Sequence, residues 1–180
     1  MNNKQIRFQG RFMTVYTFDK LMPDGSYDHF EVCEYRPSVK FFVFNERKEI
    51  LLVREYRHDV NKDVLRIPGG FIDDGETPQE AVLRECQEEL NVKPNKIVQY
   101  AVRYQGYDEE RKPSEYAYLC SELIDAPLRS ADKHEYIHEV VPMSLDEVAK
   151  LILDGTINND WRGLIFLRMK RDIEQGKIPL

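Results

Sequence analysis

Hydrophobic residues in the first third of the chain fall into short runs that polar turns separate. Two of these runs flank Met22-Pro23-Asp24-Gly25, in which Pro and Gly stand where a hairpin turn favours them. Two more runs flank the polar segment Asn45-Glu46-Arg47-Lys48. The pattern therefore predicts two β-hairpins, with strands over residues 13–18, 27–35, 40–44 and 49–56.

Between positions 77 and 91 the period of the apolar residues becomes helical. Four apolar side chains fall on one arc when each residue is placed at about 100° around a helix axis. They are Val82, Leu83, Cys86 and Leu90. Thr77 is predicted as the N-cap, with Pro78 at N1 and Glu80 at N3 completing a capping box. Asn91 follows the last apolar position and suits a left-handed C-terminal cap.

The elements around this helix are predicted from turn signals and further apolar runs. Before it, residues 65–68 predict a strand that leads into a turn at Gly69 and Gly70. After it, Ser144 with Glu147 at N3 predicts a second capped helix. The remaining predicted elements are strands over residues 97–104, 115–120 and 137–143 and a last helix over residues 160–175.

Three carboxylates on the first helix carry the candidate chemistry. Glu85, Glu88 and Glu89 stand at i, i+3 and i+4, so they share one side of the helix, where like charges repel. Glu85 and Glu89 border the apolar arc, whereas Glu88 lies further round toward solvent. An isolated group of this kind is usually a solvated face. A site for a hard cation is the alternative, and oxygen ligands favour Mg²⁺ or Mn²⁺ over Zn²⁺.

The spacing of the charged residues resembles the Nudix box, G-x5-E-x7-R-E-U-x-E-E-x-G-U with U aliphatic. The matching positions are Gly70, Glu76, Arg84, Glu85, Glu88 and Glu89. Cys86 replaces an aliphatic residue and Asn91 replaces the last glycine, but all acids of the pattern are present. The complete pattern favours the metal site over the solvated face.

The resemblance implies the Nudix fold, an α+β arrangement in which a mixed β-sheet is sandwiched between helices (α/β/α). Residues 39–180 would form the Nudix hydrolase domain. Residues 1–38 are similar to the β-rich N-terminal arm that pairs subunits in ADP-ribose pyrophosphatase dimers. The resemblance therefore also implies a homodimer.

The same resemblance implies roles for the box residues. Glu85, Glu88 and Glu89 would bind Mg²⁺ or Mn²⁺, together with the backbone carbonyl of Gly69. Arg84 would orient neighbouring carboxylates, with Glu76 as its partner. The catalytic base in related enzymes often comes from a mobile loop, where Glu135 best matches and Glu139 is the second choice. A solvated loop glutamate is the alternative for Glu135.

Further resemblance points to the ADP-ribose pyrophosphatase and nucleoside diphosphate sugar hydrolase branch. It rests on Val53-Arg54-Glu55-Tyr56-Arg57 ahead of the Gly69-Gly70 turn, and on Gly155-Thr156-Ile157 near the end. The implied substrate-binding residues are Arg54, Arg57, Phe30 and Tyr107. Ordinary packing and strand-end positions are the alternative for these four residues.

The implied reaction is Mg²⁺-dependent hydrolysis of a nucleoside diphosphate sugar, such as ADP-ribose, to a nucleoside monophosphate and a sugar phosphate. Residues 105–114 lack a Ser-Pro-Gly pattern, so GDP-mannose or a broad set of nucleotide sugars stays open. Hydrolysis of dinucleoside polyphosphates and non-catalytic sensing of a nucleotide sugar stay open as well. Loss of box acids would favour the sensor, and none is lost.

Composition agrees with a globular enzyme that acts on a small molecule. The chain has 180 residues, a length typical of one domain. Its formal charge of −6 argues against binding nucleic acid or an anionic membrane. Three cysteines without a CxxC pair suggest neither a disulfide scaffold nor a zinc cluster. No signal-peptide core follows Met1, so a cytoplasmic location is predicted.

Overall fold

The computed structural model describes residues 2–107, 111–126, 136–157 and 160–179. The chain divides into two compact units. The first unit comprises residues 1–38 and 102–115, and the second comprises residues 39–101 and 116–180. Residues 102–115, which the predicted division at position 38 assigns to the hydrolase domain, thus group with the N-terminal segment.

The first unit contains an antiparallel sheet of order β1-β2-β3. Its strands are β1 (Asn2–Gln9), β2 (Met13–Leu21) and β3 (Tyr27–Tyr35). The predicted hairpin of β2 and β3 is confirmed, with Leu21 opposite Tyr27 and the Gly25 N–H donating to the Met22 carbonyl at 3.0 Å. Gly25 has a φ of +84°, which explains the glycine in this turn.

The strand β1 has no counterpart in the prediction. Its sequence is mostly polar, and its large apolar side chains Ile6 and Phe8 are exposed, so no buried face imposes a strand pattern. Its pairing with β2 also contains register shifts. An element without its own apolar periodicity is not visible to a pattern-based prediction.

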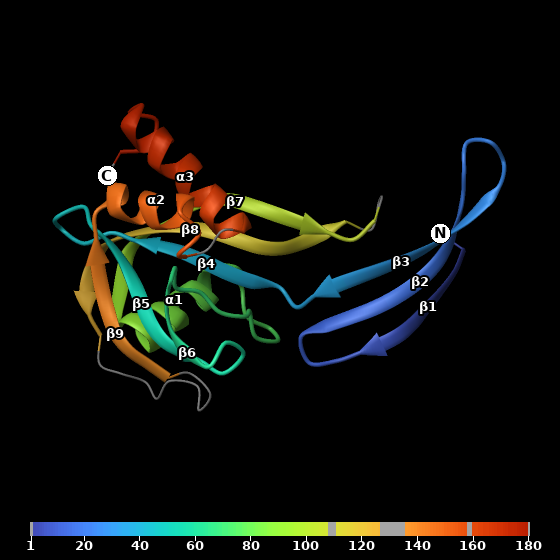
Figure 1. The fold of residues 1–180 in the computed structure, drawn as a ribbon, viewed down its shortest axis with the longest axis horizontal. Coiled ribbons are helices and arrows are strands. Elements are labelled where there is room, and N and C mark those ends of the chain that lie inside the picture. Colours follow the sequence, from blue (N-terminus) through green and yellow to red (C-terminus); the bar gives the residue numbers. More distant parts are fainter. Residues whose placement is uncertain (1, 108–110, 127–135, 158–159, 180) are drawn as a thin grey trace. The chain divides into compact units, whose positions relative to one another are not determined.

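The second unit contains strands from two three-stranded sheets and three helices (Figure 1). One sheet has the order β4-β8-β7 and the other the order β6-β5-β9. The strands are β4 (Ser38–Val43), β5 (Ile50–Arg57), β6 (Lys62–Arg66), β7 (Val92–Gln105), β8 (Lys112–Asp125) and β9 (Tyr136–Met143). The end of β7 and the start of β8 fall within residues 102–115 and so belong to the first unit. The helices are α1 (Pro78–Leu90), α2 (Leu145–Leu153) and α3 (Trp161–Glu174).

The second predicted hairpin is wrong. The strands β4 and β5 lie in different sheets, although the turn between them closes through an Asn45 N–H bond to the Glu49 carbonyl at 3.0 Å and a bridge between Phe44 and Ile50. All of β4 except Lys40 is buried, and β5 is buried over its first four residues, Ile50 to Val53. The strand β4 pairs with the distant β8, and β5 pairs with the following strand β6 and the distant β9, so the turn between β4 and β5 does not decide the pairing.

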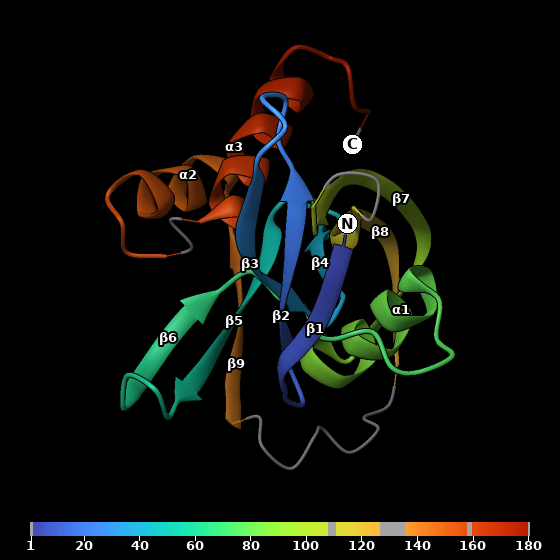
Figure 2. The same ribbon diagram turned by 90° about the vertical axis from the view of Figure 1, so that its right-hand side faces the viewer.

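Two hydrophobic cores lie on opposite faces of these strands. Successive residues of a strand point to opposite faces. Phe42 and Leu52 accordingly pack in the core that includes α2 and α3, whereas Phe41 and Val53 pack in the core that includes α1. Figures 1 and 2 show α1 on one side of the sheets and α2 and α3 on the other. Burial on both faces explains the continuous apolar runs of β4 and β5.

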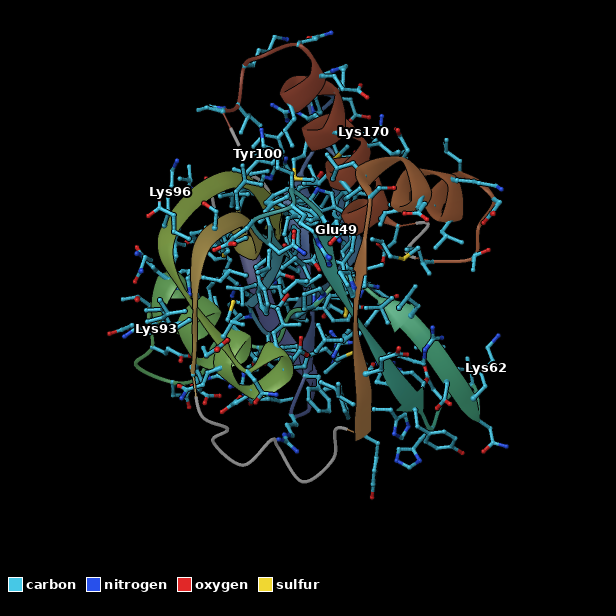
Figure 3. All side chains as sticks on the ribbon, turned by 90° about the vertical axis from the view of Figure 1, so that its left-hand side faces the viewer. Glu49, Lys62, Lys93, Lys96, Tyr100 and Lys170 are labelled. Carbon is cyan, nitrogen blue, oxygen red and sulfur yellow. The ribbon has the colours of Figure 1, made fainter. Side chains whose placement is uncertain are left out.

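The predicted start of α2 is confirmed, and α3 lies within the predicted range 160–175, whose two end residues are its caps. Ser144 caps α2 in a capping box with Glu147, and Asp160 caps α3. Figure 3 labels Tyr100 on β7 and Lys170 on α3. The Tyr100 hydroxyl donates to Asp172 of α3 at 2.7 Å, and burial together with this bond raises the pKa of Tyr100 to about 12. None of the helices in the described part of the chain is long and apolar enough to cross a membrane.

Candidate active site

The helix α1 carries the three acids and is fixed at both ends by its own side chains. The Glu80 N–H donates to the Thr77 hydroxyl at 3.3 Å, and the Thr77 N–H donates to the Glu80 carboxylate at 2.8 Å. Asn91 ends the helix with a φ of 58° and a ψ of 29°. Both predicted caps are confirmed. They stabilise a helix whose acids repel one another.

The turn at Gly69 and Gly70 packs directly on the acidic side of α1. The Gly69 N–H donates to Glu89 Oε2 at 3.0 Å. A Cβ atom on Gly70 would lie 1.8 Å from Glu85 Oε1, so only a glycine lets the backbone approach this carboxylate so closely. The turn itself is held to β4, since the Val39 N–H donates to the Gly70 carbonyl at 2.8 Å.

Burial differs among the three acids in the order that their helical angles predict. Glu89 is 2% exposed and Glu85 is 6% exposed, whereas Glu88 is only partly buried. A buried carboxylate without a partner is costly, so Glu85 and Glu89 need cationic or hydrogen-bonding partners. Two arginines provide them.

Arg84 joins the less buried acids. Its guanidinium donates to both oxygens of Glu76 at 2.9 Å, to Glu85 Oε1 at 2.7 Å and to Glu88 Oε2 at 3.1 Å. A further bond at 2.8 Å reaches the Phe71 carbonyl. The hydrogen bond to Glu76 contributes most to raising the pKa of Arg84 above its ordinary value. The predicted pairing of Arg84 with Glu76 is confirmed.

Arg66, at the end of β6, joins the most buried acids and is not singled out by the sequence pattern. Its Nη2 atom donates to Glu55 Oε2 at 2.7 Å and to Glu89 Oε1. Its Nη1 atom lies 3.4 Å from Glu89 Oε2. Burial alone would lower the pKa of Arg66, but the charge of Glu89 and the bond to Glu55 raise it above its ordinary value.

Glu55, on β5, is the second carboxylate that Arg66 contacts. Burial opposes its ionisation, yet the bond to Arg66 prevails and holds the pKa of Glu55 below its ordinary value. Glu55 lies within the predicted Arg54–Arg57 segment. Its inward direction follows from strand alternation, which a prediction could have used, but its partner Arg66 could not be found in that way.

The other predicted residues lie in several places. Arg57 pairs with Asp59 at 3.0 Å and lies 3.6 Å from Glu55. Arg54 pairs with Glu139 at 3.0 Å on the surface. Glu135 lies outside the described residues.

The two predicted stacking residues belong to the first unit. The rings of Phe30 and Tyr107 lie 5.0 Å apart, and both contact the buried ring of Phe18. Lys20 lies 4.7 Å from the centre of the Tyr107 ring. The geometry shows an aromatic cluster inside this unit.

The donor set suits a hard divalent cation, although its carboxylates are turned toward arginines. Among the residues that the structure describes, no three Asp, Glu, His or Cys side chains converge as they would around a metal ion. Arg66 and Arg84 contact the carboxylates of Glu55, Glu76, Glu85, Glu88 and Glu89, so five carboxylates face two guanidinium groups and three are in excess; Arg57, near Glu55, is paired with Asp59. The excess of buried negative charge and the oxygen-only donors fit Mg²⁺ or Mn²⁺.

Known proteins match both the sequence and the fold. The NUDIX domain model matches residues 34–161. An ADP-ribose pyrophosphatase of Bacillus subtilis is 25% identical over 152 residues, covering 83% of this chain and 80% of that protein. A CMP-5'-(N-acetyl-N-hydroxy-3-aminopropyl)phosphonate hydrolase of Streptomyces rubellomurinus is 28% identical over 156 residues, covering 84% and 72%.

The fold itself is matched by a crystal structure of an ADP compounds hydrolase. The TM-score is 0.70 at 21% identity, over 98% of this chain and 95% of that one. The predicted fold class, an α+β fold of the Nudix type, is confirmed. Because the family model covers most of the chain and the box acids gather around one glycine turn, this protein belongs to the Nudix family and is a Nudix hydrolase.

Proposed function

We propose that this protein uses Mg²⁺ to hydrolyse the pyrophosphate bond of a nucleoside diphosphate sugar, such as ADP-ribose, to a nucleoside monophosphate and a sugar phosphate. The observation that carries the proposal is the packing of the Gly69-Gly70 turn on Glu85 and Glu89 of α1. This packing gathers buried oxygen donors where the charge of a diphosphate needs a cation.

Glu85, Glu88, Glu89 and the Gly69 carbonyl are the proposed metal ligands, with Mn²⁺ as a second suitable ion. A bound divalent cation offsets charge on the phosphate oxygens and lowers the pKa of the attacking water. Arg84 donates one charged hydrogen bond to Glu85 and one to Glu88, and its bidentate pair with Glu76 holds the guanidinium in place. It thereby limits the directions in which their oxygens can point.

Glu135 is the proposed catalytic base, and Glu139 is the second choice. Glu139 is exposed and pairs with Arg54, which already occupies its carboxylate. Arg54 and Arg57 are the proposed contacts for the diphosphate or the terminal sugar. Glu135→Gln should lower kcat by about 10²–10⁴-fold if Glu135 is the base. An unchanged kcat would transfer this role to Glu139 or to a box acid.

The substrate class is supported by the relative that is named an ADP-ribose pyrophosphatase. A sensor without catalysis is disfavoured, because every acid of the Nudix box is present and two of them, Glu85 and Glu89, lie against the glycine turn. Dinucleoside polyphosphates would offer the same diphosphate chemistry, so they belong in the test.

A homodimer formed through the first unit is also proposed. This unit exposes several large apolar side chains, and exposed apolar surface often marks an interface. They are Ile6, Phe8, Phe12, Leu21, Tyr27 and Tyr35. The stacking roles of Phe30 and Tyr107 stay predictions. A cytoplasmic location is proposed as well, since Cys33, Cys86 and Cys120 are free thiols.

The decisive experiment is a substrate panel with products identified by mass. The purified protein is incubated with Mg²⁺ and ADP-ribose, GDP-mannose, UDP-glucose, NADH or diadenosine polyphosphates. A nucleoside monophosphate and a sugar phosphate should appear from at least one nucleotide sugar, and Glu89→Gln should remove this turnover. Turnover of none of the compounds would refute the proposed function. Exclusive turnover of diadenosine polyphosphates would replace its substrate.

A further inference from the structure

The Arg66 guanidinium lies buried between two carboxylates from other elements. Glu55 comes from β5 and Glu89 comes from α1, and they are 4% and 2% exposed. The same nitrogen, Nη2, donates to both carboxylates. Arg66 Nε is buried and has no hydrogen-bond partner among the described residues. The position of Arg66 therefore pairs both acids with a positive charge but leaves one of its own N–H donors without a hydrogen bond.

Glu89 has little free capacity in this arrangement. Its Oε1 atom accepts from Arg66 Nη2, and its Oε2 atom accepts from the Gly69 N–H at 3.0 Å, with Arg66 Nη1 at 3.4 Å. A carboxylate has about four acceptor positions. A cation that binds Glu89 therefore has to share the carboxylate with Arg66 or displace the guanidinium from it.

A positive charge this close also opposes a second one. Two like charges a few ångströms apart repel, and the repulsion grows as burial lowers the local dielectric constant. Arg66 cannot relieve this repulsion by losing its proton, because the guanidinium stays charged in proteins. Its other acceptors among the described residues are Glu55 and the Ile67 carbonyl, which lies 3.4 Å from Nη1, and of these two only Glu55 is charged.

We propose that Arg66 is a positioning residue that acts as an internal cation competing with the divalent metal for Glu89, and that Glu55 weakens this competition by sharing Arg66. The inference rests on the proposed function, because it takes Glu89 as a metal ligand. It assigns a role to two residues outside the Nudix box. Arg84 differs from Arg66, since its main partner, Glu76, is not a proposed metal ligand.

The proposal predicts opposite effects for the two neutral variants. In Arg66→Gln the competing charge is removed, so Mn²⁺ should bind about tenfold more tightly. In Glu55→Gln the guanidinium loses its second charged acceptor and turns fully to Glu89, so Mn²⁺ should bind about tenfold more weakly. If Arg66 and Glu55 had a purely structural role, the two substitutions would change the Mn²⁺ affinity in the same direction or not at all.

The test measures Mn²⁺ binding to the full chain by calorimetric titration, without substrate. A parallel thermal melt in chelator and in Mn²⁺ reports the stabilisation that the ion provides, which should be larger than wild type in Arg66→Gln and smaller in Glu55→Gln. Arg103→Gln is the matched control, because it removes an exposed arginine paired with Glu115 at 2.9 Å in the first unit. This control should leave Mn²⁺ affinity unchanged.

Each outcome decides between the two proposals. If Glu89→Gln binds Mn²⁺ with the same affinity as wild type, the metal site of the proposed function is wrong. If Glu89→Gln weakens binding but Arg66→Gln does not tighten it, only the competition is refuted. Should Arg66→Gln not fold, Glu55→Gln decides alone: weaker Mn²⁺ binding supports the competition, and equal or tighter binding overturns it.

Discussion

Arg84 and Arg66 each form an ion-pair network in the site, and the two networks differ in how deeply they are buried. Arg84 has a side chain that is 25% exposed, and its carboxylate partners Glu76, Glu85 and Glu88 lie within 8 residues of it in the sequence. Arg66 is 11% exposed and holds two carboxylates that are almost without solvent contact. Water can replace a lost partner around Arg84 but not around Arg66. The first arginine orients acids, and the second also neutralises them.

The largest effect should come from the acid that Arg66 holds. Glu89→Gln removes a proposed metal ligand, and metal catalysis contributes several kcal/mol, so kcat should fall on the order of 10³-fold. Steady-state rates with ADP-ribose and Mg²⁺ measure this loss. Glu76→Gln, which changes only the acceptor of Arg84, is the control and should lose much less. Equal losses would remove the distinction between the two networks.

The next effect concerns stability. Arg66→Met leaves Glu55 and Glu89 buried without a counter-charge, so the free energy of unfolding should fall by about 3–5 kcal/mol. Arg84→Met should cost about 1–2 kcal/mol, because its acceptors are closer to solvent. Urea denaturation in chelator compares the two variants. A larger loss for Arg84→Met would mean that burial does not separate the two arginines.

A smaller effect should follow from the glycine turn. In Gly70→Ala the new Cβ would meet the Glu85 carboxylate, which lies 1.8 Å from its position. The carboxylate has to turn away from the site, so Mn²⁺ affinity should drop by about 10–100-fold. Gly25→Ala is the control for a glycine substitution in a turn of the first unit: no atom lies within 4 Å of its Cβ position, so the variant adds only the backbone strain of its φ of +84° and should leave Mn²⁺ affinity unchanged. Unchanged Mn²⁺ affinity in Gly70→Ala would exclude Glu85 as a ligand.

The smallest effect is the dependence of stability on pH. The pKa of Glu55 is lowered in the folded protein, so its contribution to stability is fully present above its unfolded pKa, near 4.5, and is lost as pH falls through the lower folded value. The acid unfolding curve of Glu55→Gln should therefore be flatter below pH 4.5 than that of wild type. Glu46→Gln, which changes an exposed glutamate in the turn between β4 and β5, is the control. Identical slopes for Glu55→Gln and wild type would show that Arg66 does not hold Glu55 in its ionised form.

Local features of the site could be predicted from the sequence because their partners are near one another. The capping boxes join Thr77 with Glu80 and Ser144 with Glu147, three residues apart, and helical angles place Glu85 and Glu89 beside the apolar arc. The pairing of Arg84 with Glu76 followed from the box pattern. Helix geometry brings together the capping residues and places the two acids, whereas Glu76 precedes the helix and its pairing was predicted from the resemblance to the Nudix box.

Long-range features could not be predicted in this way. Arg66 is 11 residues from Glu55 and 23 residues from Glu89, and no periodicity relates β5, β6 and α1. The separation of β4 and β5 into different sheets has the same origin, since their partners β8 and β9 come late in the chain. Pairing over such distances depends on the whole fold, which a local turn signal does not contain.

The placement of Glu55, Arg66 and Glu89 on three different elements also has a consequence for folding. Each of these charges is costly to remove from water alone, and the cost is offset only when β5, β6 and α1 are all in place. A partly assembled site is therefore less stable than either the folded or the unfolded site. The catalytic region should gain its structure late and together with the core, so that a chain with an intact site is a chain that has finished folding.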